Sequence, residues 1–373
     1  MSQDWKRIAA ELGASFAERA AGYDDGDRFV VENYGELKQK KIFSMAVPSE
    51  LGGGGAKLSD TCELLRELGK HCGSTALALS MHQHLLAAAV VRHLKGMPAA
   101  PLLKKVAESE AVLVSTGASD WIDANGSAER VEGGYRVNAK KIFGSGSPSG
   151  DVMITSVAWN SDPEGPSVLH FSLPLKSEGV KVQDDWRTLG MRGTGSHTIA
   201  FENVFVPEGS ISLKRPQGKW HAAWDIACNV ALPIFMSAYI GVAEAAAELA
   251  LERAKSKPVK QATLIAVGEM ENARTAALLA WQDMVNRSAN YDFPVNIESS
   301  NAQLVRKTLA SKALRQTVEK AMEVAGGSAF FRKLPLERMW RDVQGSPYHP
   351  LPENRQLLYT GGVRLGVERF WDV

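Results

Sequence analysis

Two of the eight histidines stand close together, in the segment Ser80-Met81-His82-Gln83-His84. Histidine titrates near neutral pH, so either ring can exchange a proton with a bound substrate. On a helix, residues two apart point about 200° from each other, so at most one of the two should enter a site. For each ring the alternative is a partly exposed or structural histidine.

No group of residues has the spacing of a metal site. The three cysteines, Cys62, Cys72 and Cys228, form neither a CxxC knuckle nor a disulfide framework. No HxxxH pattern or matching carboxylate spacing accompanies them. We therefore expect no metal and a reducing compartment, the cytoplasm.

The glycine clusters do not form a phosphate-binding loop. Gly52–Gly55 follows a turn, Gly144-Ser145-Gly146 lacks the third glycine of GxGxxG, and no GK[ST] sequence occurs. A Rossmann site needs a strand, a glycine turn and a helix in that order. We interpret these glycines as turns.

Composition excludes several classes of protein. The 373 residues carry a net charge of +1 with scattered Lys and Arg, so nucleic acid is not an expected partner. Residues 1–21 are amphipathic and mixed in charge, unlike a signal peptide. No uninterrupted run of about 18 apolar residues occurs, so no membrane span is expected.

Helical periodicity extends to about residue 110 and returns after Trp220 in long Ala- and Leu-rich stretches. Between them lie short β-rich stretches separated by turn residues. This segregated order predicts an α+β, mostly α fold rather than a doubly wound sheet. We expect an N-terminal helical domain (1–110), a middle antiparallel β-barrel or sandwich domain (111–215) and a C-terminal four-helix bundle (216–373). The expected strands are residues 112–115, 130–137, 152–158, 168–173 and 198–206.

Five segments, in order along the chain, resemble the acyl-CoA dehydrogenase superfamily. Val47–Gly54 resembles its VPEELGG turn, and Tyr135–Ser147 and Leu189–Pro207 resemble its two β-domain signatures. Ala321–Asp342 resembles the segment with a diglycine and an Arg-Asp pair, and Gln356–Gly366 resembles the last helix. The resemblance implies FAD held between the β-domain and the helical bundle, and a homodimer or homotetramer in which a neighbouring subunit grips part of the cofactor.

The resemblance assigns several residues to the flavin ring. Ser115 and Ser119 match hydroxyls on the strand that contacts the isoalloxazine; the alternative is turn-capping serines. Phe143 matches an aromatic residue against the ring, and Ser145 matches a hydroxyl near flavin N5. Alternation along a strand would place both on one face; the alternative for Phe143 is a residue of the β-domain core.

Other residues match the part of the family that binds the cofactor phosphates. Arg253 matches an arginine that reaches the partner subunit's diphosphate, and Gly326-Gly327 matches the diglycine that lets backbone approach it. Glu323 replaces the usual Gln, and a carboxylate beside a diphosphate is unfavourable. FMN in place of FAD is therefore the alternative cofactor.

The catalytic carboxylate of the family is missing from both of its usual positions. Those positions fall at about Pro350 and at Ala231, and neither residue can remove a proton. Glu353 is the nearest carboxylate, and it serves as the base if its loop bends. His349 is the other candidate, because the superfamily's flavin monooxygenases resemble this chain in having a histidine there.

Three functions follow from this ambiguity. The first is a flavin-dependent monooxygenase that uses His349, with His82 as a further catalytic candidate and a flavin reductase as partner. The second is an acyl-CoA dehydrogenase that uses Glu353 on an acyl thioester and passes electrons to an electron-transfer flavoprotein. The third is a non-catalytic homologue that binds flavin or CoA.

Overall fold

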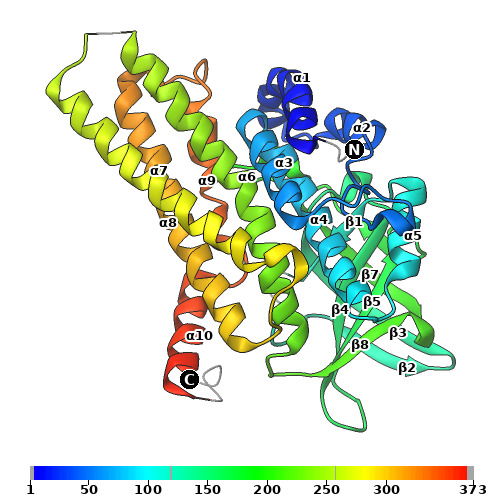
Figure 1. Cartoon of the computed structure of the whole chain (residues 1–373). Helices are drawn as coiled ribbons and strands as arrows, with labels where there is room; N and C mark the ends of the chain where they lie inside the picture. Colours follow the sequence, from blue (N-terminus) through cyan, green and yellow to red (C-terminus); the bar gives the residue numbers. More distant parts are fainter. Residues whose placement is uncertain (1–3, 118–119, 257, 368–373) are drawn as a thin grey trace.

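The computed structural model describes residues 4–117, 120–256 and 258–367. Helices, then strands, then helices follow one another along the chain, as predicted (Figure 1). The N-terminal helices are α1 (Trp5–Asp25), α2 (Val31–Gln39), α3 (Leu58–His71), α4 (Gly73–Leu94) and α5 (Ala100–Ser109). The C-terminal helices are α6 (Ala222–Lys255), α7 (Gln261–Arg287), α8 (Ile297–Ala325), α9 (Leu336–Val343) and α10 (Glu353–Leu365).

The middle domain consists of two open four-stranded sheets. One sheet has the order β1 (Leu113–Ser115), β4 (Val152–Trp159), β5 (Ser167–Pro174) and β8 (Ile211–Pro216). The other has the order β2 (Ser127–Val131), β3 (Gly134–Gly144), β7 (His197–Pro207) and β6 (Val180–Val182). The predicted sandwich is thus confirmed, whereas neither sheet closes into a barrel.

Three details of the sheets differ from the sequence prediction. β1 and β4 pair in parallel, so the domain is not purely antiparallel. The stretch expected as a strand at 130–137 is a hairpin, and Gly133, which with Gly134 was also expected to form a turn, takes a positive φ of 75° between β2 and β3. β6 and β8, which are short edge strands, were not predicted.

A hydrophobic core of its own lies between the two sheets. Alternation along each strand directs one set of side chains inward. The core residues include Val114, Val137, Met153, Val157, Leu169, Phe171, Ile199, Phe201, Val204 and Val206. The helical domains share a second core, which also includes Leu113 and Val152 from the sheet edge. The core of the helical domains therefore continues into the β-domain at β1 and β4.

Helix α6 lies between the N-terminal helices and α7–α8 (Figure 1). It packs tightly on α3 because a glycine stands at the crossing. A Cβ on Gly241 would come 2.0 Å from the backbone oxygen of Arg66. This contact requires glycine and holds α6 against the N-terminal domain.

Two helices, α4 and α6, are long and apolar enough to cross a bilayer by length and composition. The most apolar window of α4 is 78% buried inside the protein, and that of α6 is 89% buried. Such burial is typical of core helices, which pass the same test. Their apolar surface is covered by the other elements of the fold.

Candidate active site

A largely apolar cavity of about 580 Å³ lies between α4, α6, the β-domain and the loop that follows α9. One stripe of α6 forms a wall along it, at a spacing of three or four residues: Trp224, Ala227, Ala231, Phe235 and Tyr239. Fifteen residues separate the ends of this stripe, which is about 22 Å along a helix. The cavity therefore has room for a flat cofactor together with a substrate.

His349 lies at the Tyr239 end of this cavity. Its Nε2 is 2.8 Å from the Tyr239 hydroxyl, and its ring stacks on Phe235 at 4.4 Å between centroids. The buried Tyr239 hydroxyl has no other partner among the described residues, so it donates its proton to Nε2. The proton of the neutral imidazole is then on Nδ1, which makes His349 a hydrogen-bond donor toward the cavity.

The surroundings keep His349 neutral. Burial lowers its pKa to about 3, and the charge of Lys307 adds to this effect. Throughout the physiological pH range the ring therefore carries one proton and no charge. A neutral donor is suited to hydrogen-bond an oxygen atom without introducing a buried charge.

Lys307, on α8, fixes the backbone around His349. Its ammonium group donates to three carbonyl oxygens, those of His349 at 2.8 Å, Leu351 at 3.0 Å and Pro347 at 3.4 Å. The side chain is fully buried, and burial lowers its pKa to about 8. Lys307 was not predicted from the sequence, although a lysine four residues from Gln303 and Ser311 on a buried stripe of α8 is a signal for such a role.

Of the two neighbouring histidines, His84 lines the cavity and His82 does not. His82 Nε2 lies 2.8 Å from the Phe43 carbonyl oxygen, and its Nδ1 accepts from the Leu113 N–H at 2.9 Å. Both nitrogens are used, and only 1% of the residue is exposed. His82 thus connects α4 to the loop before η1 (Ser49–Leu51) and to β1 through its two hydrogen bonds. This structural position does not support the catalytic role that was expected for His82.

The buried position of His82 predicts a pH dependence of stability. Burial lowers its pKa to about 4, below the 6.5 of an unfolded chain, so its contribution is present above pH 6.5 and is lost as the pH falls toward 4. From this residue alone we expect a loss of about 2 kcal/mol of unfolding free energy between about pH 7 and about pH 5. Urea unfolding of the wild type and of His82→Gln at both pH values measures it. If the unfolding free energy changed equally with pH in the two proteins, His82 would not be buried as a neutral ring.

Three of the four residues assigned to the flavin ring line the cavity, namely Ser115, Phe143 and Ser145, and Ser119 lies outside the described residues. Phe143 is 44% exposed and meets Trp186 edge to face at 5.9 Å. An aromatic pair at the surface of a cavity provides a wall for a flat ring. These residues therefore fit a flavin.

A directed chain of hydroxyls connects Ser145 to the loop before β7. Thr194 donates to the Met191 carbonyl at 2.9 Å, so the Ser196 hydroxyl, 2.7 Å away, must donate to Thr194. The Ser145 hydroxyl, 2.7 Å from Ser196, then donates to Ser196. Ser145 consequently presents acceptor lone pairs to the cavity.

This loop is fixed to α9 at its other end. The Met191 N–H donates to Asp342 at 2.5 Å. A Cβ on Gly190 would come 2.2 Å from the Arg341 backbone oxygen, so only glycine allows the approach. Arg341 and Asp342, which match the family's Arg-Asp pair, thus make the contacts that close one side of the cavity.

The residues assigned to the cofactor phosphates lie elsewhere. Arg253, Gly326 and Gly327 are exposed, and Arg253 Nε is 3.5 Å from the Ser328 hydroxyl. None of the three lines the cavity. They form a separate surface on this chain, so a role toward a partner subunit stays a prediction.

No free carboxylate lines the cavity among the described residues. Ala231 and Pro350, at the two positions where the family's glutamate is expected, both line it. Glu353 does not; it starts α10 and pairs with Lys312. Asp120 is a lining carboxylate, but it forms a buried pair with Lys141 at 2.6 Å.

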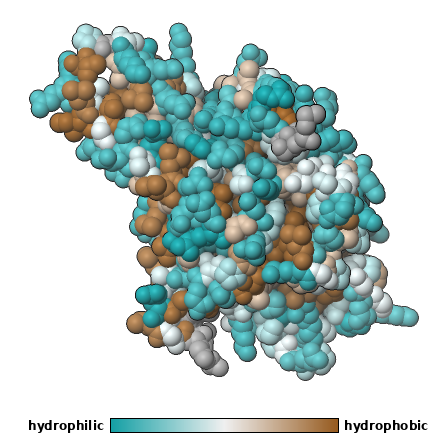
Figure 2. Space-filling view, in the orientation of Figure 1, coloured by the Kyte–Doolittle hydropathy of each residue, from teal (hydrophilic) through white to brown (hydrophobic). Residues whose placement is uncertain are grey.

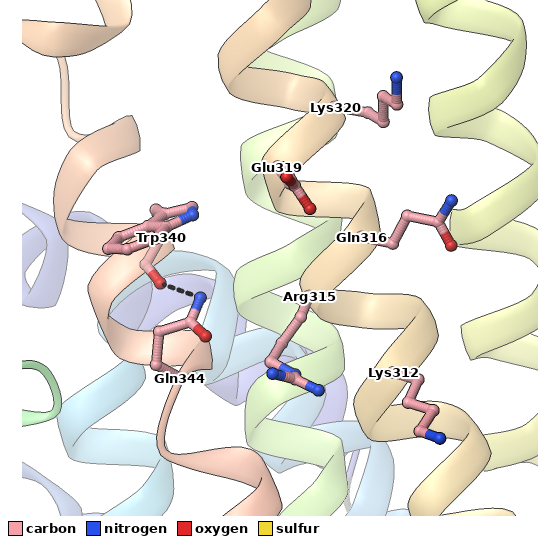
Figure 3. Close-up of a pocket in the computed structure, with 7 residues that line it drawn as sticks. All are labelled: Lys312, Arg315, Gln316, Glu319, Lys320, Trp340 and Gln344. Atoms are coloured by element: carbon pink, nitrogen blue, oxygen red, sulfur yellow. Dashed lines mark hydrogen bonds between the residues drawn. The ribbon is translucent and has the colours of Figure 1, made fainter.

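A second, polar hollow of about 450 Å³ opens between α8 and α9 on the outside of the bundle (Figure 3). Lys312, Arg315 and Lys320 surround it, and the Gln344 amide donates to the Trp340 carbonyl at 3.1 Å. Lys312 and Lys320 are already paired with carboxylates of the chain. None of the predicted site residues that the structure describes lines this hollow.

The fold and cavity define a class: a helical, β and helical enzyme with a flat-ring site at the domain junction. Sequence families identify the same three parts as acyl-CoA dehydrogenase domains, N-terminal at residues 6–110, middle at 115–204 and C-terminal at 234–351. The chain belongs to the acyl-CoA dehydrogenase superfamily. It is a flavin-dependent oxidoreductase, and FAD and FMN are the cofactors consistent with its relatives.

Relatives from both branches of the superfamily resemble the chain over nearly its whole length. A putative acyl-CoA dehydrogenase of Bacillus subtilis, YdbM, is 24% identical and covers 93% of each chain. A dibenzothiophene monooxygenase of Mycolicibacterium goodii is 26% identical, over 92% of this chain and 89% of its own. The solved structure of KijD3 with FMN and a dTDP-sugar has a TM-score of 0.88 at 22% identity, covering 99% and 96%.

Proposed function

We propose that the protein is a flavin-dependent monooxygenase that oxygenates a small, largely apolar substrate. One observation carries the proposal: both positions for a catalytic carboxylate face the cavity, as Ala231 and Pro350, while a neutral histidine lies beside them. α,β-Dehydrogenation of an acyl thioester needs a base for the α-proton. A neutral imidazole with a pKa of about 3 is too weak for that task.

The residues of the chain have defined parts in this function. A bound reduced flavin supplies the electrons that activate oxygen. His349 donates a hydrogen bond from its Nδ1–H to an oxygen atom in the cavity, while Tyr239 keeps the other nitrogen in place. Phe143, Trp186 and the apolar stripe of α6 exclude water.

The electrons have to reach the flavin from outside. Because substrate oxidation does not reduce the cofactor in this reaction, a flavin reductase is the proposed partner, in place of an electron-transfer flavoprotein. We place the protein in the cytoplasm, where reduced nicotinamides are available to such a reductase.

We also propose a homodimer or homotetramer. Four leucine and isoleucine side chains on α7 and α8 are exposed by 55–67%, namely Leu264, Ile265, Leu279 and Leu309. Figure 2 shows hydrophobic atoms along the edge where Figure 1 places these helices. Exposed apolar side chains on neighbouring helices favour burial against another surface. Size-exclusion chromatography with light scattering tests this arrangement.

Because Glu353 does not line the cavity, its replacement distinguishes a monooxygenase from a dehydrogenase. Glu353→Gln is expected to change turnover by less than about twofold, whereas loss of a general base costs about 10²–10⁴-fold. Steady-state kinetics with the preferred substrate measure the effect. A loss of the larger size would restore the dehydrogenase assignment.

Anaerobic mixing of the flavin-loaded protein with acyl-CoAs of short, medium and long chain tests the proposal from the other side. We expect the visible absorbance of the flavin to persist, because no carboxylate can remove the α-proton. Bleaching by any of these thioesters would support a dehydrogenase. Persistent absorbance together with no oxygenation of any substrate would support the non-catalytic alternative.

A further inference from the structure

The end of the cavity remote from His349 is built from aromatic side chains. Trp121 and Trp224 stack at 5.2 Å between ring centroids with planes 10° apart. His170, on β5, lies 5.7 Å from Trp224. These three residues, here called the aromatic end, all line the cavity.

The tautomer of His170 is fixed by an arginine. The Nε–H of Arg215, on β8, donates to His170 Nε2 at 3.0 Å. Since Nε2 is an acceptor, the proton of the neutral ring is on Nδ1. Burial, with the nearby Arg215 charge, lowers the pKa of His170 to about 3. No described residue hydrogen-bonds Nδ1, so His170 offers a donor to the cavity.

Arg215 also fixes the loop that carries Trp121. It is 1% exposed, and its terminal nitrogens donate to the carbonyls of Ile122 at 2.7 Å, Asp120 at 2.8 Å and Asp123 at 3.3 Å. Its guanidinium lies 5.3 Å from the centre of the Trp224 ring. One buried residue therefore positions both tryptophans and the histidine.

The indole N–H of Trp224 does not add a second donor to this end. It is buried and has no hydrogen-bond partner among the described residues. A buried donor without an acceptor costs free energy. The indole nitrogen is shielded from the cavity, so the Nδ1–H of His170 is the donor that this end presents to a ligand.

The aromatic end offers no charge to an anionic ligand. The donors of Arg215 are taken up by carbonyl oxygens and His170, and Lys141 is paired with Asp120. A phosphate or carboxylate placed here would lose its hydration without gaining an ion pair. The ligand group should therefore be uncharged.

We propose that the aromatic end binds a planar, uncharged ring that carries a hydrogen-bond acceptor, and that His170 is the donor that orients it. This inference rests on the proposed function for its identification of the ring as part of the substrate. The tryptophans supply a flat wall, and His170 Nδ1 selects rings with a carbonyl or similar oxygen. The remote position predicts an effect of His170 on KM rather than on kcat.

The test is a binding experiment with two probes of nearly the same shape, acetophenone and ethylbenzene. Dissociation constants are measured by ligand-observed NMR on the FMN-loaded full chain, without oxygen or reductant. We expect the wild type to bind acetophenone about tenfold more tightly, as one net hydrogen bond provides. His170→Phe should abolish this preference, and His170→Gln, which keeps an acceptor for Arg215 and a donor, should retain part of it.

Two further variants keep the result interpretable. Trp224→Leu should weaken both probes, and His93→Phe, near the exposed end of α4, should change neither. Equal affinities of the wild type for both probes, or an unchanged preference in His170→Phe, would overturn the inference. The inference would also be overturned if His170→Phe changed the affinity for FMN but not the affinities for the two probes. Because the assay involves no turnover, its outcome is independent of whether the protein is a monooxygenase.

Discussion

Replacing His349 with phenylalanine is expected to lower kcat/KM by about 10²–10³-fold, the range that one positioned hydrogen-bond donor contributes. Phenylalanine keeps the stack on Phe235 but removes the Nδ1–H that faces the cavity. Flavin affinity should change little, because Ser115, Phe143 and Ser145 are intact. Steady-state kinetics with reduced flavin supplied, together with a flavin titration, measure both quantities.

The control is His93→Ala, which removes a histidine from outside the cavity and should leave turnover unchanged. Because the pKa of His349 is about 3, its protonation state is constant from about pH 5 to about pH 8. The wild-type pH profile should therefore show no ionisation of this group near pH 6.5. A profile that breaks there and flattens in His349→Phe would mean that the ring titrates, contrary to its surroundings in this structure.

Lys307→Met is expected to have the second largest effect, on stability and on turnover together. It leaves the carbonyls of Pro347, His349 and Leu351 without their donor, at a cost of about 3–5 kcal/mol of unfolding free energy. The loop that carries His349 then loses its attachment to α8. We expect the folded fraction to retain flavin binding and to lose about 10–100-fold in kcat, since misplacement of a catalytic group has this effect.

Lys312→Met is the matched control on the same helix. Its side chain is 54% exposed and pairs with Glu353, so its loss should cost less than about 1 kcal/mol. Urea unfolding and kinetics of the two variants, measured side by side, provide the comparison. Equal effects of the two substitutions would show that the Lys307 contacts do not position His349.

The order of the domains could be predicted because it depends on local periodicity. Helical and strand patterns differ over a few residues, so the change near Ala111 and the return after Trp220 are visible in one sequence. Strand pairing is not local: the parallel β1–β4 pair joins residues about 39 apart, as in Leu113 with Val152. Short edge strands such as β6 have too few residues to show an alternation.

The site could be predicted where short local motifs identify its residues, but not where distant parts of the chain meet. The resemblance placed Ser115, Phe143, Ser145 and His349 at the cavity, where the structure has them. It could not distinguish His82 from His84, because the rotation of α4 against the β-domain decides which ring faces inward. The partners of the histidines, such as Tyr239 110 residues before His349, come from distant elements and are fixed only by tertiary packing.

The most direct test of a monooxygenase function is oxygen-isotope incorporation. The protein is supplied with FMN, a flavin reductase, reduced nicotinamide and labelled dioxygen, with dibenzothiophene as the first probe and aromatic ketones as further probes. A monooxygenase should give a product that contains one atom of labelled oxygen, formed only with reductase and oxygen and lost in His349→Phe. Flavin reduction by an acyl-CoA in the absence of oxygen, with no labelled product from any probe, would contradict this function.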